Sequence, residues 1–488
     1  MKPIKNEVML ITYADSLGHN LKELEGVLEK YFDKAVKGVH ILPFFPSSGD
    51  RGFAVIEYDK VDPNFGTWED IDRLGEKYTL AADFMLNHVS IRSREFKDYM
   101  EKGDASEYRN MFIHWDEFWP GGEPTEAESD AMYRRKPGGA YMEFTRKDGK
   151  TVKLWNTFFS EQVDIDPYSQ ATQDYFQRNL SLLAKHVPLI RFDAFAYASK
   201  RPGTSCFFVE PDIWNVLDIA MKPLRTTHTQ MLAEIHENYT IQLKMAEKGY
   251  WVYDFALPML LLHGLYAGRT DRLIHWLHIC PHNQYTTLDT HDGIGVVDVV
   301  DLLTDEEIDY VREIVDKITE PANQYIKRPS MIKLTGKQAQ RYQLGCTYYN
   351  ALNCNDDAYL LARAVQFFTP GIPQVYYVGM LAGKNDIENL KNGGEGRSIN
   401  RHNYTLQEVD QAVQQPVVRK LLRLMQFRNE YKVFDGEFSV GEPGEEGKLT
   451  MSWKDGELQA VLSADFKTHA FTITYWDPAD NKEKTLEL

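Results

Sequence analysis

The sequence has four cysteines in 488 residues, and they carry no metal-site or redox pattern. None forms a Cys-x-x-Cys pair or stands near other ligand types at the spacing of a zinc site. A disulfide framework is equally unexpected for so few, widely separated thiols. We therefore predict four reduced, buried cysteines, at Cys206, Cys280, Cys346 and Cys354.

Cationic side chains and long apolar runs are also scarce. Lys and Arg number 55 against 72 Asp and Glu, which gives a formal net charge of −17. Nucleic acids and anionic membranes need basic patches, so neither is an expected partner. No apolar run reaches transmembrane length, and the first residues are too polar for a signal peptide. We expect a cytoplasmic protein that meets any anionic ligand with a local cluster of cations.

The sequence also lacks a glycine-rich phosphate fingerprint after its first predicted strand, which argues against an open dinucleotide-binding sheet. It has instead eight apolar runs typical of buried strands, with helix-like segments between them. The runs are 8–13, 38–45, 81–87, 189–196, 230–235, 251–257, 286–290 and 372–378. The predicted helices include 21–31, 68–77, 170–186 and 214–222. This alternation predicts a closed (β/α) barrel, with an open doubly wound sheet as the alternative.

Two gaps in the alternation are too long for simple loops and predict folded insertions over the C-terminal face of the barrel. We expect the barrel in three parts, 1–89, 168–293 and 354–431, with insertions at 90–167 and 294–353. Beyond residue 431, short alternating strands with polar turns predict a small β-sandwich domain, 432–488. The predicted fold class is an α/β TIM barrel with two inserted loop domains and a C-terminal β domain.

Charged side chains stand at the ends of several predicted strands. Arg191 and Asp193 lie two apart near the end of the run at 189–197, so both point the same way. Similar runs end in Asp83, Asn87 and His88, in Glu234 and His236, and in Asp289, His291 and Asp292. In a parallel barrel these ends converge on one face, where catalytic groups collect. A structural Arg–Asp pair is the alternative interpretation of Arg191 and Asp193 alone.

Three carboxylates of this set suit glycosyl transfer with retention. Such transfer needs a carboxylate nucleophile on one face of a sugar and a protonated carboxylic acid on the other. Arg191 would keep Asp193 ionised, and Glu234 would be kept protonated by a drier setting. Asp292 is the third carboxylate. A metal site is not expected at 289–292, because adjacent residues of a strand point to opposite faces.

These strand ends resemble the four signature regions of the α-amylase superfamily of retaining barrel enzymes. The resemblance covers nearly the whole chain and is closest to the sucrose phosphorylase branch. The stretches that carry it include 38–53, 154–158, 369–379 and 396–402. It implies a double displacement that converts sucrose and phosphate to α-D-glucose 1-phosphate and fructose, with no cofactor besides phosphate as co-substrate and no metal.

The resemblance also implies a role for individual residues. Asp193 is the nucleophile, Glu234 is the acid/base, and Asp292 stabilises the transition state with Arg191 and His291. Other implied substrate-binding residues are Asp50, Phe53, His88, His236, Gln343 and Arg401. Of these, His236 should face the leaving group.

The leaving group itself stays open. Candidates to bind it, or phosphate, are Arg134, Lys136, Arg341 and Tyr342. Arg341 stands where we expect an apolar residue, and Asn403 replaces an expected Tyr. The segment that contains Asn403 and the stretch 203–210 resemble relatives that act on sucrose 6′-phosphate. Tyr342, however, stands where those relatives carry a cationic His. Sucrose 6′-phosphate, with fructose 6-phosphate as the leaving group, is therefore the alternative substrate.

Two other functions fit the same barrel. A hydrolase would release glucose at a rate that phosphate does not raise. A non-catalytic sugar-binding subunit would be expected to lose one of the carboxylates, and all three are present. We expect sugar and phosphate as the ligands, and a monomer or homodimer as the assembly.

Overall fold

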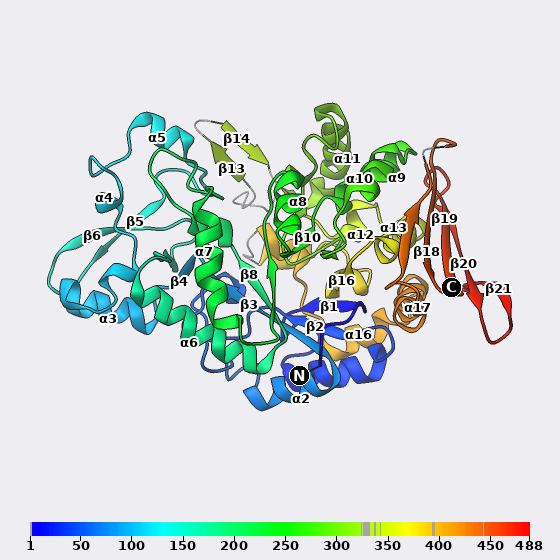
Figure 1. The fold of residues 1–488 in the computed structure, drawn as a ribbon, viewed down its shortest axis with the longest axis horizontal. Helices are drawn as coiled ribbons and strands as arrows, with labels where there is room; N and C mark the ends of the chain where they lie inside the picture. Colours follow the sequence, from blue (N-terminus) through cyan, green and yellow to red (C-terminus); the bar gives the residue numbers. More distant parts are fainter. Residues whose placement is uncertain are drawn as a thin grey trace. The chain divides into compact units, whose positions relative to one another are not determined.

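Eight parallel strands form a closed barrel in the computed structural model of this chain, which describes residues 2–323, 325, 332–335, 338–341, 343–392, 396–442 and 444–488. Their order around the barrel is β1, β16, β11, β10, β9, β8, β3 and β2. Figure 1 shows the chain as a ribbon, with β1, β2, β3, β8, β10 and β16 among the labelled strands. The strands are β1 (Met9–Thr12), β2 (Gly38–Ile41), β3 (Thr79–Met85), β8 (Leu189–Asp193), β9 (Gln230–Ala233), β10 (Trp251–Asp254), β11 (Gln284–Thr286) and β16 (Ile372–Tyr376). The predicted barrel is confirmed.

One strand lies earlier in the sequence than predicted. The run at 286–290 was expected as the seventh strand, but β11 ends at Thr286. Thr287 Oγ1 then donates to the carbonyl of Asp289 at 2.6 Å, which turns the chain out of the sheet. The polar residues at 287–292 therefore form the loop that follows β11, and Asp292 is a loop residue.

Residues of the barrel belong to two compact units. Unit 1 comprises Met1–Pro3, Ile41–Ile235 and Ile332–Arg341, and unit 2 comprises Ile4–His40, His236–Met331 and Tyr342–Leu488. Strands β3, β8 and β9 lie in unit 1, whereas β1, β10, β11 and β16 lie in unit 2. The side chains predicted to be catalytic are thus divided between the two units.

The helices between the strands follow the predicted pattern. Helix α2 (Trp68–Lys77) begins with a capping box in which Asp70 accepts from the amide of Thr67 at 2.8 Å. Helix α6 (Gln170–His186) is capped by Ser169 and buries an apolar stripe. Two of the four predictions are off by a few residues: α1 (Leu21–Val27) continues as a π-helical turn, and α7 (Asp212–Met221) begins earlier than expected.

The remaining helices outside the insertions lie in unit 2. They are α8 (Tyr239–Glu247), α9 (Leu257–Ala267), α10 (Asp271–Ile279), α13 (Asp356–Phe368), α14 (Tyr377–Met380), α15 (Ile387–Lys391), α16 (Leu406–Ala412) and α17 (Pro416–Glu430). Among the described residues, no helix is both long and apolar enough to cross a membrane.

The first insertion has an aromatic core of its own. Its elements are β4 (His88–Ser90), α3 (Arg94–Lys102), α4 (Trp115–Phe118), α5 (Glu126–Ala131), β5 (Tyr141–Thr145), β6 (Thr151–Trp155) and β7 (Gln162–Asp164). Trp115, Trp119 and Trp155 pack together with Met132 and Cys206. Strand β4 pairs with β7 in register His88 to Asp164, so the insertion is fastened directly behind the end of β3.

The second insertion joins the loop after β11 to the part of the chain that leads to α13. It contains β12 (Ile294–Gly295), α11 (Asp305–Asn323), the hairpin β13 (Ile332–Thr335) and β14 (Gln338–Arg341), β15 (Gln343–Leu344) and α12 (Tyr348–Ala351). Helix α11 begins with three acidic residues, Asp305, Glu306 and Glu307. Strand β12 pairs antiparallel with β15, placing Gly295 opposite Gln343.

The C-terminal domain is one antiparallel sheet, with strands β17 (Glu437–Val440), β18 (Lys448–Asp455), β19 (Leu458–Asp465), β20 (Ala470–Asp477) and β21 (Lys482–Thr485). A small β-sandwich was expected, but the second layer is helical. Helix α13 packs on β18, β19 and β20, and Phe427 of α17 contacts Tyr475. The apolar face of the sheet, with Leu449, Met451 and Leu462 buried, is thereby covered without a second sheet.

Candidate active site

In unit 1, Arg191 on β8 joins three carboxylates. Its Nη1 lies 2.5 Å from Asp83 Oδ1 and 2.7 Å from Asp193 Oδ1, and its Nη2 lies 3.9 Å from Glu234 Oε1. The register between β3 and β8 places Asp83 opposite Arg191, which accounts for the first contact. We call Asp83, Arg191, Asp193 and Glu234 the acidic cluster, because one guanidinium serves three carboxylates.

The backbone after β8 also holds Glu234. Ala194 has a left-handed conformation, with φ 53°, and its amide donates to Glu234 Oε2 at 3.2 Å. The side chains of Asp193 and Glu234 are 15% and 14% exposed, whereas that of Asp83 is fully buried. Asp193 and Glu234 are therefore the two carboxylates of the cluster that are partly exposed to solvent, whereas Asp83 contacts Arg191 from within the barrel.

Three of the predicted sugar-binding residues lie together in unit 1. His88 Nε2 lies 3.1 Å from the carbonyl oxygen of Phe53, and Gln162 donates to Asp50 Oδ2 at 3.1 Å. The ring centroid of Phe53 is 5.9 Å from the guanidinium carbon of Arg191. Burial lowers the pKa of His88, so its imidazole stays neutral near pH 7. These contacts connect Asp50, Phe53 and His88 to the acidic cluster.

In unit 2, cations surround Asp292. Arg397 Nη1 lies 2.9 Å from its Oδ1, Arg401 Nη2 lies 3.9 Å from the same oxygen, and His291 Nε2 lies 3.7 Å from Oδ2. Burial alone would raise the pKa of Asp292, but Arg397 and then His291 and Arg401 outweigh it and hold this pKa far below its usual range. We call Asp292, His291, Arg397 and Arg401 the basic cluster.

Backbone contacts keep the basic cluster in shape. Asn400 Nδ2 donates to the carbonyl of Asp292 at 2.7 Å, and Arg401 Nε donates to the carbonyl of His291 at 2.9 Å. Asp289, in the same loop, instead pairs with the buried Arg363 at 2.7 Å. Asp289 thus anchors the loop after β11 to Arg363, whereas Asp292 of the same loop belongs to the basic cluster.

His236 and Gln343 both lie in unit 2 and are buried. The imidazole of His236 stacks on Phe255, with ring centroids 3.8 Å apart, and its Nδ1 lies 3.3 Å from Asp298 Oδ2. Gln343 sits on β15 opposite Gly295. The second insertion therefore supplies both the residue that contacts His236 and the strand that carries Gln343.

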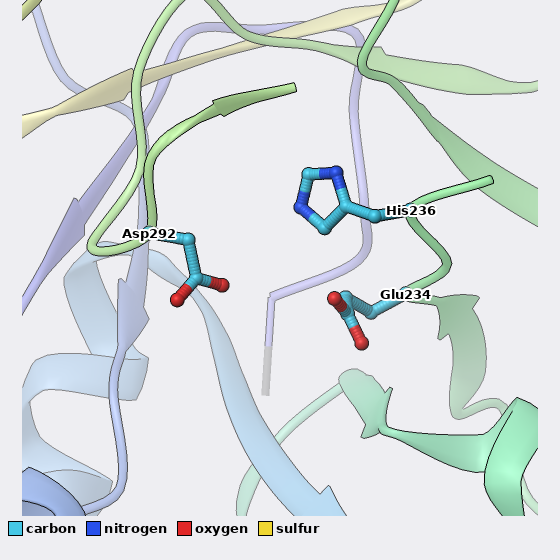
Figure 2. A group of neighbouring side chains, drawn as sticks. All are labelled: Glu234, His236 and Asp292. Atoms are coloured by element: carbon cyan, nitrogen blue, oxygen red, sulfur yellow. The ribbon is translucent and has the colours of Figure 1, made fainter. Parts of the chain in front are cut away.

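Glu234, His236 and Asp292 form a group of neighbouring side chains (Figure 2). Their carboxylate oxygens and a ring nitrogen lie within 4.8 Å of one another, and within the described part of the chain this is the one group with metal-binding spacing. Asp292 already has Arg397 2.9 Å away, and that guanidinium would repel a divalent cation. This repulsion disfavours a metal ion at the group, and the absence of a metal remains a prediction.

The residues expected near the leaving group fall into two sets. Arg134 donates from Nη1 to the carbonyl of Gly138 at 2.9 Å, and the Lys136 ammonium contacts Asn156 Oδ1. Burial lowers the pKa of Lys136 to about 8. Arg341 ends β14, but its side chain lies outside the described residues, as does all of Tyr342. Their roles stay predictions.

Sequence reasoning missed two cations. Arg397 is the cation nearest to Asp292, yet it lies in a polar 3-10 turn, Gly396–Asn400, without periodicity to mark it. The side chain of Lys200 is buried, and its Nζ lies 2.9 Å from Asp164 Oδ2 and 2.7 Å from Asn87 Oδ1, which connects the chain after β3 to β7. A lysine in an otherwise apolar segment, 194–200, was the available signal for the second.

Comparisons with known proteins identify the family of the chain. The family model described as "Alpha amylase, catalytic domain" matches residues 10–205. The chain is 51% identical to the sucrose phosphorylase of Streptococcus mutans over 476 residues, covering 97% of this chain and 98% of that protein. It is 45% identical to the sucrose 6(F)-phosphate phosphorylase of Thermoanaerobacterium thermosaccharolyticum over 484 residues, covering 97% of each.

A solved structure extends the agreement to the fold. The crystal structure of sucrose 6F-phosphate phosphorylase from Thermoanaerobacter thermosaccharolyticum matches with a TM-score of 0.92 and 43% identity, covering 100% of this chain and 99% of that one. The chain therefore belongs to the sucrose phosphorylase and sucrose 6′-phosphate phosphorylase branch of the α-amylase superfamily.

Proposed function

We propose that this protein is a retaining phosphorylase that transfers the glucosyl unit of sucrose to inorganic phosphate. The observation that carries the proposal is the contact of one guanidinium, Arg191, with both Asp193 and Glu234. A retaining site needs two carboxyl groups close together in opposite protonation states. Identity of 51% to a sucrose phosphorylase over nearly the whole chain supports the choice of substrate.

The first half of the reaction forms a covalent intermediate. The Asp193 carboxylate attacks the anomeric carbon as the bond to the fructosyl oxygen breaks, and Glu234 gives that oxygen its proton. Asp193 suits the nucleophile because Arg191 lies 2.7 Å away and stabilises its charged form. Glu234 suits the acid because it is the carboxylate farthest from the shared guanidinium. The products are fructose and a β-glucosyl enzyme.

The second half regenerates the enzyme. Glu234, now a carboxylate, takes the proton of an incoming phosphate, whose oxygen attacks the anomeric carbon and displaces Asp193. The product is α-D-glucose 1-phosphate. Asp292, with His291 and Arg401, binds glucosyl hydroxyls that strengthen their hydrogen bonds in the oxocarbenium-like transition state, and Asp50, Phe53 and His88 bind the rest of the ring.

Sucrose 6′-phosphate is the second candidate substrate. Arg134 and Lys136 are two residues apart in the first insertion, and burial lowers the pKa of Lys136 to about 8. A cation that is desolvated in this way gains more from an anionic partner than a solvated one does. This loop would therefore favour a leaving group that carries a phosphate. The identity of 45% to a sucrose 6(F)-phosphate phosphorylase is consistent with it.

A side-by-side assay tests both candidates. The purified protein is given sucrose or sucrose 6′-phosphate, with and without phosphate, and glucose 1-phosphate and glucose are measured. We expect glucose 1-phosphate in the presence of phosphate, and a higher kcat/KM for the true substrate. Asp193→Asn is the inactive control. Glucose release at a rate that phosphate does not raise would identify a hydrolase and contradict the proposal.

Phosphate is the one co-substrate in this scheme, and neither a cofactor nor a metal takes part. We place the enzyme in the cytoplasm, as a monomer or homodimer. Four free cysteines, three of them buried, suit a reducing compartment. The net charge of −17 disfavours nucleic acid and anionic membranes as partners.

A further inference from the structure

Asp298 is a buried carboxylate for which the reaction above has no use. It lies in a 3-10 turn, Val297–Val299, directly after β12 in the second insertion, and is 2% exposed. In the part of the chain that the structure describes, its side chain bonds to one other side chain, that of His236, at 3.3 Å. Burying a carboxylate costs free energy unless a partner compensates it, so this single contact calls for an explanation.

The two groups stabilise each other. Burial raises the pKa of Asp298, and the nearby imidazole of His236 opposes that shift by charge and by the hydrogen bond. The contact is short enough for His236 Nδ1–H to donate to the carboxylate. A carboxylate bound to one ring nitrogen of a histidine fixes which nitrogen carries the proton and how the ring is turned.

The ring of His236 is restrained in a second direction. It stacks on Phe255 at 3.8 Å between centroids, with an angle of 17° between the planes, and Phe255 stacks in turn on Tyr253 of β10. Stacking fixes the plane of the imidazole but still allows the ring to flip over about the Cβ–Cγ bond. The contact of Nδ1 with Asp298 selects one of the two flip states, in which Nε2 points away from Asp298.

Gly295 makes room for the pair. A Cβ at this position would lie 2.0 Å from Asp298 Oδ2 and 3.3 Å from His236 Nδ1. Any larger residue would therefore push the carboxylate off the imidazole. Because Gly295 also pairs with Gln343 across β12 and β15, the insertion, the carboxylate and the imidazole are held as one assembly.

We infer that Asp298 is a positioning residue that holds His236 with Nδ1 as the donor to its carboxylate, so that Nε2 is the atom offered to the departing sugar oxygen and then to the incoming phosphate. This inference rests on the proposed phosphorylase function. It assigns the second insertion a part in the acceptor step, exerted through a buried carboxylate that touches neither sugar nor phosphate.

The test compares Asp298→Asn with the wild type in two half-reactions. The amide introduced by this substitution can present N–H groups to Nδ1 and favour the other tautomer, so kcat/KM for phosphate should fall about 10- to 100-fold. Formation of the glucosyl enzyme from α-D-glucosyl fluoride should change less than about 3-fold, because fluoride needs little help from an acid or from His236. Equal losses in both half-reactions would overturn the inference.

Two further variants guard against a loss that is only structural. Gly295→Ala keeps Asp298 but displaces it, and should reproduce the selective loss of Asp298→Asn. The double variant Asp298→Asn with His236→Gln should lose no more than His236→Gln alone, because both changes remove one interaction. Additive losses would overturn the inference. Asp301→Asn, an exposed aspartate of the same segment, is the matched control and should behave as the wild type.

A measurement without turnover separates this inference from the proposed function. In ¹⁵N-histidine-labelled protein, the signals of His236, assigned by their loss in His236→Gln, should show a protonated Nδ1 in the wild type and a change in Asp298→Asn. Unchanged His236 signals would overturn the inference even if the enzyme is a phosphorylase. Failure of the wild type to form glucose 1-phosphate would instead contradict the proposed function.

Discussion

The acidic cluster and the basic cluster bury charged side chains with opposite ratios of carboxylates to cationic groups. In unit 1 one guanidinium, Arg191, serves three carboxylates, whereas in unit 2 one carboxylate, Asp292, has two guanidinium groups and an imidazole around it. An excess of carboxylates can be relieved by a proton on one of them. An excess of cations keeps a carboxylate ionised at every physiological pH.

This difference matches the two kinds of work proposed for the site. The acidic cluster can exchange a proton and form a covalent bond, because its charge balance changes easily. The basic cluster cannot, and its Asp292 is suited to a fixed hydrogen-bonding and electrostatic role. The number of cations around an aspartate therefore decides whether its carboxyl group can exchange a proton or stays ionised.

The largest effect is expected from the reactive member of the acidic cluster. Asp193→Asn removes the proposed nucleophile and should lower kcat on sucrose by at least about 10⁴-fold, because water or the remaining carboxylates do not replace a positioned nucleophile. The measurement is glucose 1-phosphate formation, together with trapping of the glucosyl enzyme by mass spectrometry. Asp174→Asn on the exposed face of α6 is the control. Near-normal activity in Asp193→Asn would end the assignment.

Glu234→Gln should show that Glu234 acts mainly by giving a proton to the leaving group, rather than by its negative charge. Loss of the proposed acid/base should lower the rate by about 10²- to 10⁴-fold on sucrose and clearly less on α-D-glucosyl fluoride, whose leaving group needs little protonation. Steady-state and single-turnover rates on both donors measure the difference. An equal loss on both donors would argue that Glu234 only positions Arg191 or Ala194. Glu247→Gln on α8 serves as the control.

Whether a contact of these clusters can be predicted from the sequence depends on whether it is set within one strand or by the pairing of distant segments. The pairing of Arg191 with Asp193 could be predicted, because two-residue alternation on a buried strand leaves both side chains on one face. The contact of Arg191 with Asp83 needs the register of β3 against β8, which one sequence does not contain. The barrel was predictable because its eight strands are rich in apolar residues and separated by helices.

The contacts of the basic cluster were harder to foresee. Arg397 reaches Asp292 from an irregular turn far along the chain, and such turns have no period from which to infer a direction. The end of β11 was misplaced because Thr287 and Thr290 are β-favouring residues, and the turn made by Thr287 overrides that propensity. Roles taken from the family resemblance, such as that of His236, remain to be tested by mutation.

Asp254 is a third case, a buried carboxyl of unit 2 whose hydrogen-bond donors are neutral. Burial raises its pKa to about 6, despite hydrogen bonds from Trp276 Nε1 and the amide of Leu257. A folded-state pKa above the unfolded value of about 3.9 means that its contribution to stability is present at low pH and lost as pH rises through 6.

The free energy of unfolding of the wild type, measured relative to Asp254→Asn, should therefore fall by about 2–3 kcal/mol between pH 4 and pH 7. Urea titrations at several pH values measure it. Asp130→Asn, an exposed substitution on α5, should show no such trend relative to the wild type. A difference that is constant with pH would mean that Asp254 does not titrate in this range, and that burial alone does not set its protonation.

The smallest effect is expected where the basic cluster is altered without loss of charge. Arg397→Lys keeps a cation near Asp292 but removes the planar guanidinium. The orientation of the contact with Asp292 should therefore change more than the charge near Asp292 does. We expect kcat/KM for sucrose to fall about 10-fold, or about 1.4 kcal/mol, with Arg401 and His291 keeping Asp292 ionised. The exposed substitution Arg423→Lys on α17 is the matched control. If Arg397→Lys instead lost as much activity as Asp193→Asn, the function of Asp292 would depend on Arg397 alone. The number of cations around each carboxylate would then not explain the difference between the basic cluster and the acidic cluster.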